Sequence, residues 1–196
     1  MLNVKMLIIM ILCLTNISGC SKNKIIVNNT YTCSIKEKHN HDDSINRISA
    51  KEYIQIYQYY AVKEMHYYNI PASVKLAQAI HESASGNSKL AQHAKNHFGI
   101  KCGNNWNGNI IKHNDDIANE SFRVYENIFH SYRDHSIFLQ KARYSKLFTY
   151  NIIDYKKWSY ELQKSGYATD SNYAIILIKI IEYYKLYSFD HIKIKE

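Results

Sequence analysis

The sequence contains one carboxylate, Glu82, whose position suits a proton donor. Glu82 is the last residue of a mostly apolar segment, 72–82, whose residues favour a helix. A serine-rich stretch follows, in which Gly86 predicts a left-handed end to the helix. The negative helix end and partial burial both disfavour an ionised carboxylate, so we expect the pKa of Glu82 to be raised. Such an acid can protonate the leaving oxygen of a glycosidic bond. The alternative is a glutamate in solvent at a helix end.

The other patterns of reactive side chains predict no second chemistry. His81-Glu82 begins like the zinc-protease motif, but Ser85 occupies the position of its second histidine. His93 and His97 have a spacing that suits two ligands on one helix face, yet the sequence indicates no third ligand. Neither a glycine-rich phosphate loop nor a nucleophile elbow occurs in the sequence. We therefore expect no metal and no organic cofactor.

The elements that must position the acid are mostly helices. Apolar residues at helical spacing predict a helix over 48–68, with Ser49 and Glu52 placed to form a capping box. A break at 69–71 places a proline in the first turn of the next helix, 72–82. Two short strands around a polar turn predict one exposed hairpin in a predominantly α-helical α+β domain. The remaining predicted elements are a short helix at 90–94, strands at 109–112 and 121–125, and helices at 131–142, 155–165 and 171–187.

Length and composition fit one compact domain. The 196 residues are 46% hydrophobic and 13% aromatic, which is too apolar for a disordered chain. Six glycines and one proline argue against a turn-rich β-sandwich or barrel. The formal net charge of +8 suits anionic partners such as lipid headgroups or acidic cell-wall polymers. Because the basic residues are scattered singly and form no stripe, the sequence does not favour nucleic acid as a partner.

The N-terminus has the pattern of a bacterial export signal. Lys5 precedes an apolar run, 6–14, that is too short to span a bilayer. The Ile-Ser-Gly before Cys20 resembles the lipobox, in which the cysteine is lipidated. An ordinary signal peptide with a chance cysteine is the alternative. Cys33 and Cys102 remain after maturation, and they either pair in an oxidising exterior or stay free. The predicted segments are a lipoprotein signal peptide at 1–19, a flexible tether at 20–46 and a folded domain at 47–190.

Several stretches, in order along the chain, resemble the bacterial glucosaminidase family. This is glycoside hydrolase family 73, which includes the flagellar muramidase and many autolysins. The most specific matches are Ala-Gln-Ala-Ile-His-Glu-Ser at 77–83 and Gly-Tyr-Ala-Thr-Asp at 166–170. Together the matches extend over residues 50–187, nearly all of the predicted domain. The other matching stretches are 70–73, 96–101, 106–108, 122–125, 131–135 and 173–174.

The resemblance implies a lysozyme-like α+β domain, in which a helical lobe faces a small β-hairpin lobe across a groove. The family cleaves the bond after N-acetylglucosamine in peptidoglycan or related glycans. Glu82 matches its general acid, and Tyr173 matches a tyrosine at the site. The family's second carboxylate lies on the hairpin, where Asp115 is our first choice and Asp116 our second. The reaction is then either inverting, with a water between the two carboxyl groups, or assisted by the N-acetyl group of the substrate.

Four aromatic residues in the matching stretches are candidates for sugar contacts. Tyr167 and Phe98 are expected to line the sugar groove. Trp106 and Tyr125 either support the hairpin or stack on a sugar ring. The sequence also departs from the family around the acid, because the aromatic of the frequent Glu-Ser-Gly-Trp-Gly form is replaced by Ser85. Phe-His-Ser likewise stands at 129–131, where many relatives have Glu-Glu-Ser.

Together these features predict a lipid-anchored endo-β-N-acetylglucosaminidase with Glu82 as its general acid. We expect a monomer that acts on peptidoglycan without a cofactor. Its expected location is the cell envelope, on the periplasmic side of a membrane, with the outer membrane as one option. Two alternatives remain open. One is a degenerate lipoprotein that binds wall glycan without turnover, and the other is a lytic transglycosylase, whose fold also presents a lone glutamate at a helix end.

Overall fold

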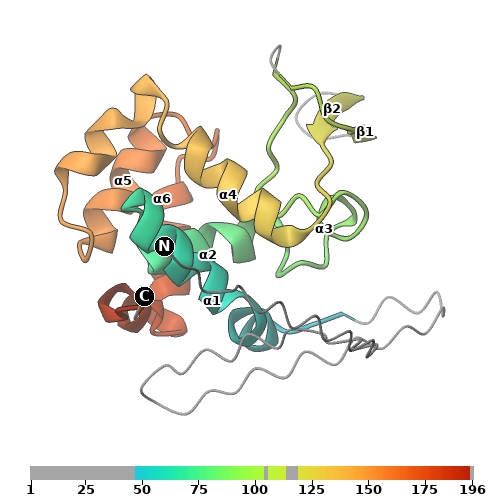
Figure 1. Ribbon diagram of the computed structural model, residues 1–196. Helices are drawn as coiled ribbons and strands as arrows, with labels where there is room; N and C mark the ends of the chain where they lie inside the picture. Colours follow the sequence, from blue (N-terminus) through green and yellow to red (C-terminus); the bar gives the residue numbers. More distant parts are fainter. Residues whose placement is uncertain (1–46, 104–105, 114–118, 195–196) are drawn as a thin grey trace, which may run out of the picture. The chain divides into compact units, whose positions relative to one another are not determined.

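The computed structural model describes residues 47–103, 106–113 and 119–194 (Figure 1). Helices dominate these residues, as predicted. The signal peptide, Cys20, the tether, Asp115 and Asp116 lie outside the described residues. The elements are α1 (Ala50–Tyr68), α2 (Ala72–Glu82), α3 (Lys89–Ala94), β1 (Ile110–His113), β2 (Glu120–Arg123), α4 (Ile128–Phe138), the 3₁₀ helix η1 (Ala142–Thr149), α5 (Tyr155–Lys164), α6 (Tyr173–Tyr183) and the 3₁₀ helix η2 (Leu186–His191).

Local capping defines α1, and the predicted capping box is confirmed. The Ser49 hydroxyl accepts from the Glu52 N–H at 3.3 Å, and the Glu52 carboxylate accepts from the Ser49 N–H at 2.7 Å. These bonds satisfy backbone donors that have no partner inside the helix. At the other end, Asn69 adopts a left-handed conformation (φ 54°) and its N–H bonds to Met65 O. The chain then turns into α2 through Pro71, which is the N-cap of α2 and not part of its first turn.

The central helix of the domain is α2, which packs against α1, α5, α6 and η2. Every residue from 72 to 80 is buried. Pro71 provides no side-chain cap for the N–H groups of the first turn, which have no partner inside the helix. Asp190 of η2 provides it from 117 residues away, because its carboxylate accepts from the Ser73 N–H at 2.8 Å and from Ser73 Oγ at 2.6 Å. The helix that ends at Glu82 is therefore fixed at its beginning by a tertiary contact.

The predicted hairpin is confirmed, and it has its own small core. β1 pairs antiparallel with β2, from Ile110↔Arg123 to His113↔Glu120. Phe122 of β2 is 1% exposed and clusters with Leu90 and Ala94 of α3. A further bridge joins Lys101 to Phe122. The hairpin thus rests on α3, on the other side of α4 from α5 and α6 in Figure 1.

Helix boundaries differ from the predictions where a cap or a left-handed residue intervenes. α4 begins at Ile128, three residues before the predicted start, because the Asn127 side chain caps it by accepting from the His130 N–H at 3.0 Å. The predicted helix at 171–187 is divided, since Lys185 has φ 55° and the chain continues as η2. The 3₁₀ helix η1 was not predicted. Each change is local and leaves the order of helices and strands as expected.

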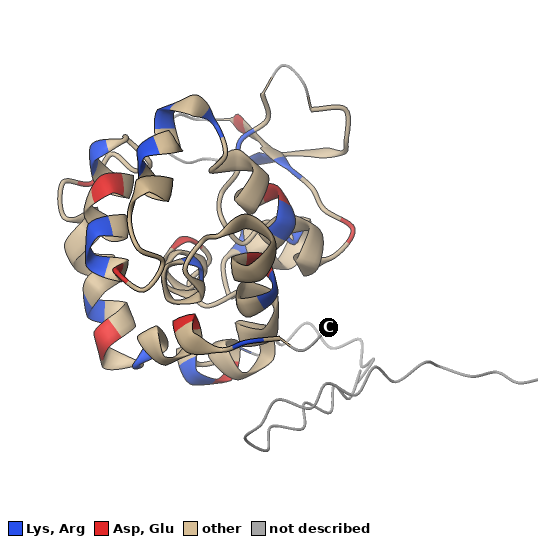
Figure 2. Ribbon diagram, turned by 60° about the vertical axis from the view of Figure 1, so that its left-hand side comes forward, with Lys and Arg blue, Asp and Glu red and all other residues tan. Residues whose placement is uncertain are grey.

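Charged residues of both signs are distributed over several helices. Figure 2 shows Lys and Arg interspersed with Asp and Glu rather than gathered in one stripe. This arrangement agrees with the scattered basic positions of the sequence. Within the described part of the chain, no helix is long and apolar enough to cross a membrane.

Candidate active site

Glu82 is the last residue of α2, and its side chain is half-buried. The residue after it holds this helix end in place. The Ser83 N–H and Ser83 Oγ both donate to Ala79 O, at 3.2 and 2.5 Å, and Ser83 Oγ accepts from the Gly86 N–H at 2.7 Å. Ser83 is fully buried. These bonds fix the backbone that carries the carboxyl group.

The loop after Glu82 contains three consecutive left-handed residues. Ala84, Ser85 and Gly86 have φ values of 49°, 58° and 78°. The predicted left-handed glycine is confirmed, but the left-handed conformation begins two residues earlier. A Cβ atom on Gly86 would lie 3.1 Å from the Tyr53 ring and 3.4 Å from the His97 ring. The loop therefore packs directly on buried aromatic rings, which requires a residue without a side chain at this position.

The structure brings Tyr173 to Glu82, although 91 residues separate them. Tyr173 Oη donates to Glu82 Oε1 at 2.8 Å. Gln78 Nε2 donates to Tyr173 Oη at 3.0 Å, which completes a chain of three polar groups. Burial raises the pKa of Tyr173 well above its usual range, and the neighbouring Tyr167 and Glu82 raise it further. Tyr173 therefore remains a protonated donor to the carboxylate.

The sequence analysis did not identify Gln78 as a site residue. Its spacing from Glu82 is the feature of the sequence that could have identified it. Gln78 lies four residues before Glu82, so both side chains are on one face of α2. Its residue type is unusual among the buried apolar residues of this helix. A fully buried amide on the same face as a candidate acid points to a hydrogen-bonded partner shared by the two.

Tyr167 supports Tyr173 from the side. The two rings stack with centroids 5.5 Å apart and planes 20° apart. Burial raises the pKa of Tyr167 well above its usual range, with a contribution from the negative charge of Glu82. His81 approaches Tyr173 edge-on, with centroids 5.8 Å apart. Burial lowers the pKa of His81, and the charge of Asp170 partly opposes that shift.

Phe98 lies in the core and not on an accessible surface. It is 3% exposed, and its ring stacks on His135 with centroids 3.9 Å apart and planes 10° apart. Tyr132 covers it edge-on at 4.9 Å. The resemblance implied that this ring lines the sugar groove. A direct sugar contact would require the ring to become exposed.

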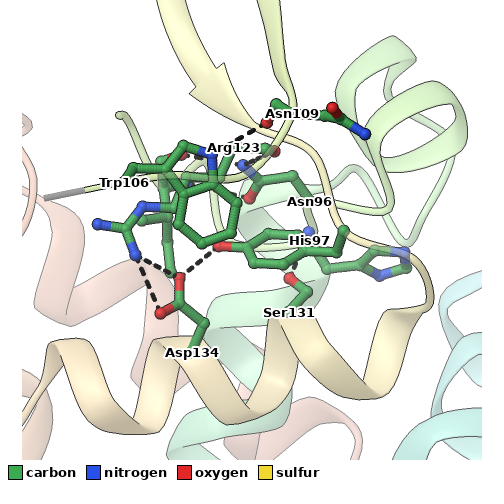
Figure 3. A network of polar contacts seen from close by, with 9 residues as sticks. Asn96, His97, Trp106, Asn109, Arg123, Ser131 and Asp134 are labelled. Carbon is green, nitrogen blue, oxygen red and sulfur yellow. Dashed lines mark hydrogen bonds and ion pairs between the residues drawn. The ribbon is translucent and has the colours of Figure 1, made fainter. Parts of the chain in front are cut away.

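A polar network joins the hairpin to α4 (Figure 3). Arg123 Nη1 donates to both carboxylate oxygens of Asp134, at 3.0 and 2.8 Å. Tyr125 Oη donates to the same carboxylate at 2.5 Å. The Arg123 guanidinium lies 4.7 Å from the Trp106 ring centroid, and Trp106 Nε1 donates to Asn109 O at 3.0 Å. The sequence left two roles open for Trp106 and Tyr125, support of the hairpin or stacking on a sugar ring, and these contacts correspond to support of the hairpin. Trp106 is nevertheless only half-buried.

Asn96 holds the segment between α3 and the hairpin. Its side-chain oxygen accepts from the Ile100 N–H at 3.0 Å. Its side-chain nitrogen donates to Ile100 O and to Arg123 O, both at 3.0 Å. Gly99, within this turn, has φ 61°. The residues at 96–101 therefore connect the end of α3 to β2 by hydrogen bonds, as Figure 3 shows for Asn96.

His97 is a buried structural histidine. Its ring Nδ1 lies 2.6 Å from Tyr53 Oη, and its backbone N–H donates to Ser131 Oγ at 3.0 Å. Burial lowers its pKa to about 4, with a smaller contribution from Lys95. Because α3 ends at Ala94, His93 and His97 do not share a helix face. Among the described residues, no group of three or more His, Cys, Asp or Glu side chains could hold a metal ion.

The hairpin tip, which contains Asp115 and Asp116, lies outside the described residues. The assignment of either residue as the second carboxylate therefore stays a prediction. Glu120, at the start of β2, is a described carboxylate of the hairpin, and it pairs with Lys101 at 2.8 Å. The pairing of Cys33 with Cys102 also involves a residue outside the described ones and stays open.

Comparison with known proteins identifies the family. A family model described as mannosyl-glycoprotein endo-beta-N-acetylglucosaminidase, the glucosaminidase domain, matches residues 58–186. The chain belongs to the glucosaminidase family. The resemblance seen in the sequence motifs is thus confirmed, and the match includes α2, the hairpin and α6.

Two curated relatives illustrate the similarity. The exo-glucosaminidase LytG of Bacillus subtilis is 35% identical in an alignment 136 residues long, which covers 64% of this chain and 48% of LytG. The peptidoglycan hydrolase FlgJ of Pseudomonas aeruginosa is 32% identical in an alignment 141 residues long, which covers 64% of this chain and 34% of FlgJ. The chain therefore spans about half the length, or less, of these glucosaminidase-family relatives.

Two solved structures share the fold. A peptidoglycan hydrolase from Sphingomonas sp. A1 aligns with a TM-score of 0.62 and 27% identity, over 71% of this chain and 92% of that one. The glycoside hydrolase domain of FlgJ from Salmonella typhimurium aligns with a TM-score of 0.59 and 26% identity, over 72% and 91%. The predicted fold class, a mostly helical lysozyme-like domain with a small antiparallel sheet, is confirmed.

Proposed function

We propose that this protein is a lipid-anchored endo-β-N-acetylglucosaminidase that hydrolyses the glycan strands of peptidoglycan. The observation that supports it most is the hydrogen bond from Tyr173 Oη to Glu82 Oε1, 2.8 Å long, at the end of a buried helix. Membership of the glucosaminidase family supplies the substrate class. Glu82 is the general acid in this proposal, and Tyr173 orients its carboxyl group.

The geometry suggests how the proton is delivered. Because Oε1 of Glu82 accepts from Tyr173, the transferable proton is placed on Oε2. As this proton moves to the glycosidic oxygen, the bond between C1 and that oxygen breaks, and its electron pair goes to the oxygen. The resulting Glu82 carboxylate is stabilised by the phenol of Tyr173, which stays protonated. A water then supplies hydroxide to C1 and releases a proton to the second catalytic group.

Asp115 is our proposal for that second group, with Asp116 beside it as a substrate-binding residue. A hairpin carboxylate on the other side of the sugar from Glu82 would suit an inverting reaction, in which it activates a water on that face. The alternative is assistance by the N-acetyl group of the substrate. Asp115→Asn is expected to lower the cleavage rate strongly, and Asp116→Asn less. Near-native rates for both single variants and the double variant would favour substrate assistance.

The remaining parts of the proposal concern binding and location. Tyr167 and Trp106 are only half-buried, which supports a role in sugar binding. The Ile-Ser-Gly-Cys20 pattern supports a lipid anchor in the cell envelope, and the net charge of +8 suits an acidic wall. We propose that the protein acts as a monomer and needs no metal or organic cofactor.

Glu82→Gln tests the catalytic assignment. Glutamine keeps the shape and can still accept from Tyr173, but it delivers no proton. General acid catalysis contributes about 100- to 10,000-fold, so cleavage of purified peptidoglycan should fall by this factor. Circular dichroism should show an unchanged fold, because glutamine and glutamate have similar helix propensities. A folded Glu82→Gln protein that keeps more than about a tenth of the wild-type rate would contradict the assignment.

Mass spectrometry of the products tests the reaction class. A hydrolytic glucosaminidase produces a reducing N-acetylglucosamine end. A lytic transglycosylase leaves an anhydro-muramic end, and a degenerate binding protein releases nothing. Long fragments at early times indicate endo cleavage, whereas release of single residues indicates exo cleavage, the mode in the name of LytG.

A further inference from the structure

The face of α2 that carries Glu82 also carries a fully buried lysine. Lys75, Gln78 and Glu82 are spaced three and four residues apart, so they form one stripe along the helix. Lys75 is 0% exposed. The proposed acid thus stands at one end of a polar stripe whose other end lies inside the core.

Lys75 is held by three polar atoms of α4. Its Nζ donates to Ser136 Oγ at 2.7 Å and to Tyr132 O at 3.2 Å, and it lies 2.9 Å from His135 Nδ1. An ammonium group has three hydrogens, so these three atoms satisfy it. The bond to Nδ1 fixes the plane of the His135 ring and places the ring proton of a neutral His135 on Nε2.

His135 belongs to a layer of four rings that leads to Glu82. We call Phe98, His135, Tyr167 and Tyr173 the aromatic layer. Phe98 stacks on His135, and His135 meets Tyr167 nearly perpendicularly, with centroids 5.8 Å apart and planes 77° apart. Tyr167 stacks on Tyr173, and Tyr173 donates to Glu82. Lys75 therefore contacts one end of a continuous layer whose other end holds the acid.

Packing alone does not account for these two residues. Burial lowers the pKa of Lys75 to about 7 and that of His135 well below its usual range. The charge of Glu64 raises the pKa of Lys75 and that of Arg133 lowers it. Within the described residues, His135 Nε2 is buried and has no hydrogen-bond partner. Apolar side chains of similar size would remove these costs and are often more stable in such positions.

We infer that Lys75 and His135 are positioning residues for the proposed glycosidase reaction, and that they act on Glu82 through the aromatic layer. Lys75 orients His135, His135 orients Tyr167, and the Tyr167 stack sets the direction of the Tyr173 hydroxyl. This inference rests on the proposed function, because it assigns a role in delivering the proton of Glu82. Neither residue contacts the substrate.

The double variant Lys75→Met/His135→Phe tests the inference. It keeps the approximate volumes and removes both polar groups, and Ser136 Oγ still donates to Tyr132 O at 3.1 Å, so the melting temperature should be equal or higher. The value of kcat on peptidoglycan should fall about fivefold or more with KM nearly unchanged, because only the orientation of the acid is lost. A weaker bond from Tyr173 favours the protonated carboxyl group, so the alkaline limb of the kcat profile should move to higher pH.

Tyr173→Phe should move the same limb in the same direction. Adding Tyr173→Phe to the double variant should shift the alkaline limb little further, because all three substitutions act on the same hydrogen bond from Tyr173 to Glu82. Asp190→Asn is the matched control, since it alters a buried polar group at the opposite end of the same helix. Its kcat and the position of its alkaline limb should equal those of the wild type.

The outcomes separate this inference from the proposed function. An active wild type with an unchanged kcat and pH profile in the double variant overturns the inference and leaves the function standing. A wild type that cleaves no glycan overturns the function, and carbon-13 NMR titration of the Glu82 carboxyl group then decides the inference. An equal titration midpoint in wild type and double variant overturns it. Should the double variant fail to fold, Lys75→Met alone is measured in the same way.

Discussion

At the scale of single residues, the contact between Tyr173 and Glu82 is the feature on which the proposed chemistry depends. Both residues were named from sequence motifs, and the structure brings them within 2.8 Å. Gln78, Lys75 and His135 were not named. Lys75 and His135 lie 60 residues apart, so their contact leaves no local pattern in the sequence. Phe98 was named from a motif, but its burial arises from stacking on His135, which only the tertiary structure reveals.

Tyr173→Phe is expected to lower kcat by about 10- to 100-fold, because a hydrogen bond to a charged group contributes about 1.5–3 kcal/mol. The ring still stacks on Tyr167, so the fold should persist. Tyr183→Phe is a matched control, since Tyr183 lies on the same helix and is 76% exposed. Reducing-end assays on peptidoglycan compare the two variants. Equal rates for both would remove Tyr173 from the mechanism.

At the scale of elements, the sequence predicted what local chemistry determines. The start of α1 follows from Ser49 and Glu52, and α2 from its uninterrupted helix-forming residues. The division of the last predicted helix did not follow, because the apolar pattern continues through the left-handed Lys185 to the buried Leu186. The N-terminal caps of α1 and α4 depend on neighbouring residues, whereas the break at Lys185 depends on the packing of the segment that follows it.

The loop after α2 offers a paired test of backbone strain. Gly86→Ala should lower the free energy of unfolding by about 1–2 kcal/mol, because φ is 78° and the new Cβ would lie 3.1 Å from the Tyr53 ring. Ala84→Gly should raise it by up to about 1 kcal/mol, since Ala84 is exposed and already left-handed. Urea unfolding at 25 °C measures both. An increase in the free energy of unfolding for Gly86→Ala would contradict the expected strain from a Cβ atom at this position.

Asp190 makes the cap of α2 sensitive to pH. Burial raises its pKa from 3.8 to about 6, against the bonds from Ser73. The folded state thus binds this proton more tightly than the unfolded state. The stability contributed by Asp190 is complete below pH 4 and is lost as pH rises to about 6, by about 3 kcal/mol at most.

Asp190→Asn should remove that dependence. His97 has the opposite effect, because its lowered pKa of about 4 makes stability increase as pH rises from 4 towards 6.5. The informative quantity is therefore the difference in unfolding free energy between wild type and variant, measured by urea titration from pH 4 to pH 7. We expect the unfolding free energy of Asp190→Asn to increase relative to that of the wild type as pH rises. A constant difference would contradict the raised pKa of Asp190.

At the scale of the whole molecule, the proposed location depends on the N-terminal segment, which lies outside the described residues. Cys20→Ala should release the protein from membranes, because it removes the cysteine of the Ile-Ser-Gly-Cys pattern that we propose to carry the lipid. Cys33→Ala is the matched control and should remain with the membrane fraction. Cell fractionation and mass spectrometry measure partition and lipid. Full membrane association of Cys20→Ala with an unchanged mass would contradict the lipoprotein prediction.

The carboxylate that caps α2 comes from a residue 117 positions later in the chain. His66 of α1 likewise bonds to Ile192 O at 2.9 Å, across 126 positions. A ribosome synthesises the chain from its N-terminus, so Ser73 emerges long before Asp190. During that interval the first turn of α2 has no carboxylate for its N–H groups. The helix that bears Glu82 therefore gains its N-terminal cap only after residue 190 has emerged, so a chain shortened before Asp190 would lack this cap.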